Sequence, residues 1–372
     1  MRSHSSFSGL IKPIPGEALS SWLERGARAK NPLPFVRAIS ALKALGIADV
    51  DQPLTNRIWS KASRCLGDDK YALQSAFQSH GDWLRIEPNR RQVMCEYCLM
   101  DDFASYRRPS MRDCWFYWWF TICPVHGSLL SSYGSTSAAE GLINALRGQM
   151  LGAPRQSLSL WRQKQAFSMW QMKALTGRTY NLLKLMAFHF QKWYMKGVLE
   201  NKFLIGEGKV PVYAKELEQF MGDLIAVIGK KRCDSEDSQT YIAEILKIRS
   251  WSSLTSTQLP AAGCKAFLCF DIGEHNSSIR MTMFALLGLF IEVPACRLIW
   301  HFGSREGPFG LEMERPEVHH LWWRMLSEVW RSTEYLEWLK DRSQHWSDTI
   351  LSTFGHLLAG KPVNYSPFFI KH

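Results

Sequence analysis

Four soft metal ligands in two closely spaced pairs constrain the fold of this chain more than any other feature. Cys95 and Cys98 form the first pair and Cys123 and His126 the second, each with two residues between its members. Such a gap lets one tight turn direct both side chains at a single ion, and thiolate with imidazole suits tetrahedral zinc. The sequence therefore predicts one Zn²⁺ ion bound by these four residues.

The predicted zinc is structural, because four protein ligands leave no open coordination position for an activated water. The alternative for any cysteine is a buried, small hydrophobic side chain. We adopt that alternative for five unpaired cysteines: Cys65, Cys233, Cys264, Cys269 and Cys296. Cys114 is expected in the core as well, although it could substitute for a ligand. The odd total of 9 cysteines argues against a disulfide framework.

Helical periodicity dominates the rest of the chain, so we expect a mainly α fold. In "GEALSSWLERGARAK", Leu19, Trp22 and Leu23 share one face, and further short helices fill residues 16–88. This series is compatible with a helix-turn-helix and equally with an ordinary bundle. The Ser/Gly-rich stretch 131–141 is the predicted domain boundary. We thus expect an N-terminal domain over 1–130 that includes the zinc motif 95–126, a linker over 131–141 and a helical C-terminal domain over 142–372.

Two features of the C-terminal half bear on its packing. Tryptophan recurs every eight residues at 322, 330, 338 and 346, a spacing that drifts about 80° per step around a helix. Such a helix is either buried on several sides or broken. The apolar run 281–300 is interrupted by Glu292, Pro294 and Arg297, so we expect a core segment rather than a membrane span. With a polar stretch after Met1, the expected location is cytoplasmic and nucleoid-associated, with no membrane partner.

The chain is basic, with a formal net charge of +11. This surplus favours a nucleic-acid partner, although solubility alone also accounts for it. Five arginines flank or lie within the zinc segment and are the candidate nucleic-acid contacts: Arg90, Arg91, Arg107, Arg108 and Arg112. They either touch phosphate or are solvated surface charges.

No assembled catalytic motif is present, so the chain is predicted not to be an enzyme. "GDLIAVIGKK" has the wrong spacing for a phosphate-binding loop and lacks a Ser or Thr after the lysine. The acid pairs Asp68–Asp69 and Asp101–Asp102 are interpreted as solvated loop residues. His319 and His320 are expected to pack beside apolar neighbours.

Two segments together resemble the TniQ family. "PIPGEALSSWLERGARAKNP" (13–32) is similar to its opening motif. "CEYCLMDDFASYRR", "CWFYWW" and "ICPVHGSLL" are similar to its zinc segment, and the resemblance covers residues 11–130. It implies a target-selection protein of a heteromeric bacterial transposon with Cys95, Cys98, Cys123 and His126 as zinc ligands.

The resemblance also implies partners. These are double-stranded target DNA or a target-bound CRISPR effector complex, and an AAA+ ATPase regulator that recruits the transposase; a homodimer is common among such proteins. Many RNA-guided relatives have a second Cys-rich finger, but residues 127–232 contain no cysteine. Two alternatives stay open: a helix-turn-helix regulator independent of transposition, and a transposase or nuclease with a carboxylate metal site.

Overall fold

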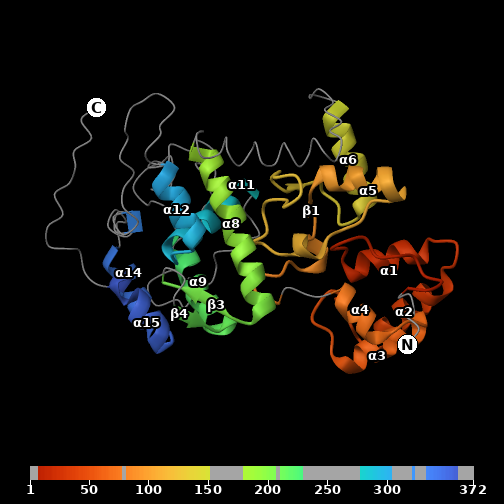
Figure 1. The fold of residues 1–372 in the computed structure, drawn as a ribbon, viewed down its shortest axis with the longest axis horizontal. Helices are drawn as coiled ribbons and strands as arrows, with labels where there is room; N and C mark the ends of the chain where they lie inside the picture. The colour runs from red at the N-terminus through yellow and green to blue at the C-terminus, as the bar shows by residue number, and fades with distance from the viewer. Residues whose placement is uncertain are drawn as a thin grey trace. The chain divides into compact units, whose positions relative to one another are not determined.

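The computed structural model describes residues 7–77, 81–150, 179–206, 210–228, 277–303, 321–322 and 332–358. This part of the chain is mainly helical and includes two short two-stranded antiparallel sheets (Figure 1). The expected fold class, mainly α with a compact Cys₃His group, is therefore confirmed.

The chain divides into two compact units, Met1–Trp170 and Gln171–His372. The predicted linker 131–141 lies inside the first unit. There, strand β2 (Ser131–Ser132) pairs with β1 (Val93–Met94), and helix α6 (Ala138–Met150) packs on α5 (Glu96–Tyr106). The Ser/Gly composition of 131–141 thus accompanies a strand and a helix start rather than a domain boundary.

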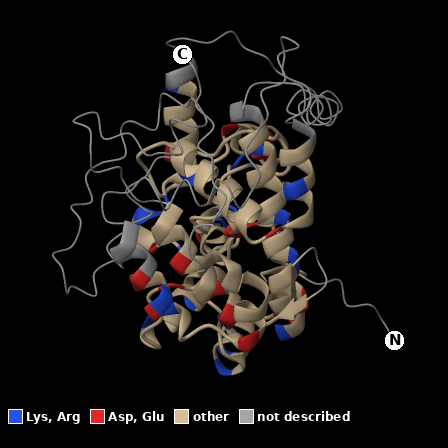
Figure 2. Ribbon diagram, turned by 90° about the vertical axis from the view of Figure 1, so that its left-hand side faces the viewer, with Lys and Arg blue, Asp and Glu red and all other residues tan. Residues whose placement is uncertain are grey.

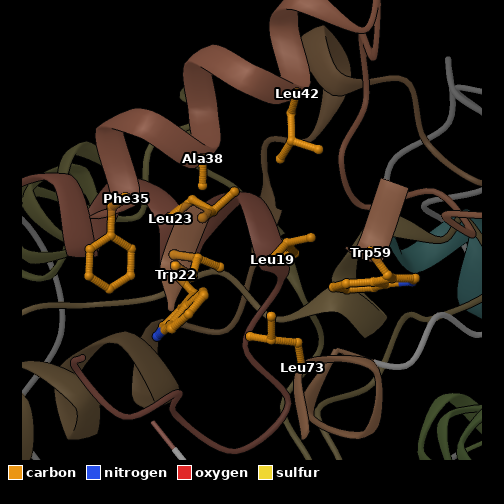
Figure 3. Close-up of a cluster of buried hydrophobic side chains, with 9 residues drawn as sticks. Leu19, Trp22, Leu23, Phe35, Ala38, Leu42, Trp59 and Leu73 are labelled. Carbon is orange, nitrogen blue, oxygen red and sulfur yellow. The ribbon is translucent and has the colours of Figure 1, made fainter. Parts of the chain in front are cut away.

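The N-terminal part of the first unit is a cluster of four helices (Figure 3). They are α1 (Leu19–Ala27), α2 (Leu33–Ala44), α3 (Asn56–Leu66) and α4 (Lys70–Ala76). Leu19, Trp22 and Leu23 point from α1 into this core, which confirms the face predicted from their spacing. Trp22 lies at the centre, edge-on to the ring of Phe35 from α2 at a centroid distance of 4.9 Å. The cluster thus combines the buried rings of Trp22, Phe35 and Trp59 with leucines from all four helices.

The α3–α4 connection has the length and the glycine of a helix-turn-helix turn. Residues 67–69 join the two helices, with Gly67 in the left-handed region at φ 71°. Asp69 then caps α4 by accepting a hydrogen bond from the backbone N–H of Ala72 at 3.0 Å. By contrast, residues 45–55 separate α2 from α3. If a helix-turn-helix is present in this cluster, α3 and α4 therefore form it, and the motif stays a prediction.

An aromatic segment supports the metal motif. After α5, the 3₁₀ turn η2 (Asp113–Phe116) begins a run of rings from Trp115 to Phe120. All of these rings are buried except that of Trp118, which is half-buried. A second 3₁₀ turn, η1 (Pro88–Arg90), precedes β1. The chain between the two ligand pairs is therefore anchored by five buried rings.

The second unit is built on the long helix α8 (Thr179–Glu200), which α11 (Ser277–Phe290) and α12 (Pro294–Gly303) pack against. The hairpin β3 (Phe203–Ile205) to β4 (Val210–Val212) follows α8 and leads into α9 (Ala214–Ile228). Every residue of α11 except Ser278 is buried, which confirms the core prediction for the start of the run 281–300. In the described part of the chain no single helix is long and apolar enough to span a membrane, and only α11 with α12, bent by 99°, passes that test as a pair.

The tryptophan repeat spans a helix break. Helix α14 (Ser332–Ser343) ends before α15 (Asp348–Phe354), which is capped by Ser347 and followed by the 3₁₀ turn η6 (Gly355–Leu358). Trp322 and Trp346 are both buried, and Trp346 packs edge-on to Phe220 of α9. Trp330 lies outside the described residues. Of the two alternatives for this repeat, a broken helix is therefore confirmed.

Candidate metal centre

The first ligand pair is positioned by the start of α5. Strand β1 ends at Met94, Cys95 is the N-cap residue of α5 and Cys98 lies in its first turn. The backbone N–H of Leu99 donates to the Cys95 carbonyl at 3.1 Å, so the helix itself sets the angle between the two side chains. A helix N-terminus also favours thiolates, because its macrodipole places positive partial charge there.

The second pair lies in a tight turn between Ile122 and Leu129, which form a β-bridge. Within this turn the Gly127 N–H donates to the Cys123 carbonyl, and the Cys123 N–H donates to the Ser128 carbonyl, both at 2.8 Å. Gly127 has φ 62°, a left-handed conformation that glycine adopts without strain. The "CPVHG" sequence is thus a closed loop that turns the Cys123 and His126 side chains the same way.

The four ligand atoms meet at distances that match a tetrahedral site. The His126 Nδ1 atom lies 3.5, 3.4 and 3.5 Å from the Sγ atoms of Cys95, Cys98 and Cys123, and the Sγ atoms of Cys98 and Cys123 are 3.6 Å apart. All four lie within 4.8 Å of one another. Ligand bonds of about 2.3 Å to sulfur and about 2.0–2.1 Å to nitrogen give tetrahedral edges of roughly 3.6 Å for S–N and 3.8 Å for S–S. The spacing of the four ligand atoms thus matches tetrahedral coordination of one metal ion.

The crowding of these groups shifts their protonation strongly. Burial lowers the pKa of His126, but hydrogen bonds with Cys123 and Cys95 outweigh it and raise the pKa to about 10. For Cys95 the effects have the opposite signs. Burial raises its pKa, but hydrogen bonds with Cys123 and Cys98 outweigh burial and hold the pKa well below its usual value. Hydrogen bonds with neighbouring thiols raise the pKa of both Cys98 and Cys123. Without an ion, the four groups therefore share protons, which a bound metal cation would displace.

A carboxylate that the sequence analysis left in solvent lies behind the imidazole. The Asp101 Oδ2 atom lies 3.1 Å from His126 Nε2, the ring nitrogen that faces away from the thiols. Metal-binding histidines commonly donate their second N–H to a carboxylate, which orients the ring and makes the ligating nitrogen more basic. Asp101 follows Cys98 by three residues on α5, which places both side chains on one side of the helix. This spacing is the sequence signal that could have identified Asp101 as part of the site.

The other member of that acid pair, Asp102, is buried and binds Arg112. Its Oδ1 accepts from Arg112 Nη2 at 2.6 Å, and its Oδ2 accepts from the backbone N–H and the hydroxyl of Ser110 at 3.1 and 2.6 Å. Arg112 is thus committed to closing the loop after α5. This pairing removes Arg112 from the candidate phosphate contacts.

Arg91 is also committed to a buried network. It is 5% exposed, and Nη1 donates to Asp49 Oδ1 and Asp51 Oδ2, both at 2.9 Å, while Nε donates to the Ile86 carbonyl at 3.0 Å. Arg91 lowers the pKa of Asp49 despite the opposing effect of burial. Arg91 therefore joins the α2–α3 loop to the segment before β1, and its burial removes it from the candidate nucleic-acid contacts.

Arg107 and Arg108 are exposed at the end of α5, and Arg108 Nη1 donates to the Arg25 carbonyl at 3.1 Å. Arg107 ends the helix in the left-handed region at φ 59°. Arg90 is half-buried, with its guanidinium 5.4 Å from the centroid of the Trp118 ring. These three arginines stay candidate contacts for a polyanion.

The remaining candidates fall outside the metal site. Cys65 packs against the N-terminal core, and Cys296 is buried and donates to the Met186 carbonyl at 3.3 Å, as expected for hydrophobic cysteines. Cys114 is half-buried and is not one of the grouped ligands. Cys233, Cys264, Cys269, His319 and His320 lie outside the described residues.

In comparisons with protein-family models, with curated proteins and with solved structures, nothing matches this chain. The resemblance to the TniQ family therefore stays a prediction that rests on the two sequence segments.

Proposed function

We propose that this protein is a non-enzymatic adaptor in transposition target selection. In this proposal it contacts target DNA, or a target-bound guide complex, and recruits an AAA+ ATPase regulator and through it the transposase. The proposal rests on the TniQ-like segments, and one structural observation supports it above the others: those segments, distant in sequence, interlock.

The interlock joins the residues around Glu17 to the loop after α5. Glu17 and Arg112 form an antiparallel β-bridge. The Ala18 N–H donates to the Met111 carbonyl at 2.9 Å, and the Met111 N–H donates to the Ser21 hydroxyl at 3.0 Å. The opening motif and the metal motif thus form one folding unit, as expected if they make up a single functional module.

Within the opening motif, the polar residues hold the fold together. The Glu17 carboxylate is fully buried and accepts from the Ile14 N–H at 2.9 Å and from Arg25 Nε at 2.9 Å, with a further contact to Arg25 Nη2 at 2.6 Å. Because buried charges persist only when paired and hydrogen-bonded, this pair needs both partners. Glu17 and Arg25 of the motif therefore have a structural role, and contacts to partners must come from exposed residues.

The ion we propose at the Cys₃His group is Zn²⁺. Three thiolates and one imidazole form a soft donor set, which suits zinc and not magnesium or calcium. Cys95, Cys98, Cys123 and His126 would occupy all four positions, so the ion would stabilise the fold and activate no water. When bound, the ion would replace the protons that the three thiols and the imidazole share. It would also link α5 to the turn at residues 122–129.

Two measurements test the proposed function. First, the purified protein is incubated with a pool of random DNA duplexes at low and near-physiological salt, since specific binding survives salt better than phosphate-only binding. Second, it is mixed with an AAA+ ATPase transposition regulator from the same genome, and the complex is sought by sedimentation. Binding to both supports the proposal, and binding to neither overturns it.

One observation favours the second candidate, a helix-turn-helix regulator independent of transposition. It is the three-residue α3–α4 connection with Gly67 in the left-handed region. A tight palindromic site in the promoter of its own gene, together with no ATPase binding, would support this candidate over the adaptor.

A further inference from the structure

One face of α3 carries only positive charge. Arg57, Lys61 and Arg64 follow one another at spacings of four and three residues, which places them on one side of a helix. All three are exposed, while Trp59 and Leu66 are buried on the opposite side. We call Arg57, Lys61 and Arg64 the α3 basic face.

The segment around this face has no exposed acid. Residues 30–67 contain only two acidic residues, Asp49 and Asp51, and both are buried in the network around Arg91. The segment holds six basic residues, all exposed and none in an ion pair within the described residues: Lys30, Arg37, Lys43, Arg57, Lys61 and Arg64. The charge that this segment presents to solvent is therefore entirely positive.

The two acids that follow along the chain accept hydrogen bonds from backbone N–H groups, and Asp69 is exposed. Asp68 accepts from the Phe7 N–H at 2.7 Å and Asp69 caps α4. Figure 2 shows basic and acidic residues interspersed on one side of the molecule, and in the second unit the exposed Lys196 pairs with the exposed Glu200 at 3.7 Å. The net charge of +11 is thus unevenly presented, although its distribution along the sequence looks uniform.

We propose that the α3 basic face binds the phosphate backbone of duplex DNA. This inference rests on the proposed function and names the surface through which the protein would meet DNA. With a rise of 1.5 Å per residue, Arg57 and Arg64 are about 10 Å apart along the helix axis. Its three cationic side chains can therefore contact up to three backbone phosphates.

Two local features adapt α3 to this partner. Its N-cap residue, Thr55, makes no side-chain capping bond and its first turn has no acidic residue, so the positive end of the helix lies next to Arg57. The helix is also held rigidly, because Trp59 and Leu66 anchor it in the four-helix core (Figure 3). Only the ends of three side chains need to be ordered on binding, which keeps the entropic cost low.

The test compares three charge-removing variants of the full-length protein in duplex binding at several salt concentrations. The first is Arg57→Gln/Lys61→Gln/Arg64→Gln, in which glutamine preserves helix propensity. The matched control, Lys192→Gln/Lys202→Gln/Lys215→Gln, removes the same charge from exposed positions in the second unit. The third, Arg107→Gln/Arg108→Gln, removes the two exposed candidate arginines at the end of α5. Circular dichroism melting verifies that each variant is folded.

If the α3 basic face contacts three phosphates, the slope of log K against log salt becomes shallower by about 2.7, since each contact contributes about 0.9. Affinity falls for all sequences alike, and the matched control keeps the wild-type slope. An equal loss in the α3 and control variants, an unchanged α3 variant, or an effect seen with RNA and not with duplex DNA overturns the inference.

The outcome also separates this inference from the function it rests on. If the wild-type protein binds duplex DNA and only Arg107→Gln/Arg108→Gln weakens it, the α3 assignment fails while DNA contact stands. If the wild-type protein binds no duplex at any salt concentration, DNA contact itself fails, and the α3 assignment with it.

Discussion

A carboxylate behind a metal-binding imidazole orients the ring and accepts from the nitrogen that faces it. Asp101 lies 3.1 Å from His126 Nε2, so that nitrogen is the donor and Nδ1 is left to face the three thiols. Tyr97 packs on the same ring, with centroids 5.5 Å apart. The orientation of His126 therefore depends on two residues of α5 that are not ligands.

We expect Asp101→Asn to weaken zinc binding by about 10- to 100-fold, the usual effect of removing such a carboxylate. The measurement is competition with a chromogenic chelator, and the exposed Asp341→Asn, in the other unit, is the control. Unchanged zinc affinity in Asp101→Asn would contradict the role assigned to this carboxylate.

His189 on α8 makes the stability of the second unit sensitive to pH. Burial, helped by the nearby charge of Lys192, lowers its pKa below the usual 6.5. The unfolded chain then binds a proton more readily than the folded one in mild acid. The stability that the neutral imidazole contributes is thus fully present above about pH 6.5 and is lost as the pH falls from there through the folded-state pKa.

The expected result is that His189→Gln melts with less pH dependence than the wild-type protein between about pH 7.5 and pH 5.5. Replacement of the exposed His345 by Gln is the control, and this variant should melt with the same pH dependence as the wild-type protein. Equal pH dependence in wild-type and His189→Gln would rule out this histidine as the source.

At the scale of elements, a glycine allows α1 and α2 to approach closely in the N-terminal cluster. A Cβ atom at Gly26 would lie 2.1 Å from the ring of Phe35, far inside van der Waals contact. Phe35 is itself 1% exposed and touches Trp22, so the ring has no room to move. Glycine at position 26 is therefore required by packing between helices, not by its own backbone conformation.

Gly26→Ala should destabilise the protein by roughly 1–3 kcal/mol, the usual cost of overpacking a core. Gly222→Ala is an informative counterpart, because Gly222 is also helical but its Cβ would meet nothing within 4 Å. There alanine should stabilise by about 0.4–1 kcal/mol through helix propensity and reduced unfolded-state entropy. Urea unfolding measures both, and a neutral Gly26→Ala would show that α1 and α2 can separate without cost.

At the scale of the whole molecule, the metal site lies entirely within the first of two compact units. Because each unit has its own core, we expect two unfolding transitions rather than one. Metal binding free energies for structural zinc reach roughly 10 kcal/mol in isolated fingers, and this energy becomes folding energy for the unit that holds the ion.

Removing zinc with a chelator should therefore lower the midpoint of one transition strongly and leave the other unchanged. Cys95→Ala should reproduce this effect, whereas Cys65→Ala removes a thiol from the same unit without touching a ligand. Calorimetry with metal analysis checks both. A protein that purifies without metal and melts identically with and without chelator would contradict a structural ion.

The sequence by itself determined the features that depend on short-range spacing. Two ligand pairs with two-residue gaps, the shared face of Leu19 and Trp22, and the helical character of the chain all follow from periods of a few residues. The break in the tryptophan repeat was one of two alternatives that the same arithmetic allowed. These features could be predicted because neighbouring residues alone define them.

Only the tertiary structure decided which charged residues are free to act. Arg91 and Arg112 look like Arg107 and Arg108 in the sequence, yet the first two pair with Asp49 and Asp102 inside the fold, whereas Arg107 and Arg108 are exposed. The same burial hides the only acids between residues 30 and 67 and leaves α3 uniformly positive. Because a buried charge must find its partner wherever the fold places one, such pairings span long sequence separations that local patterns cannot reveal.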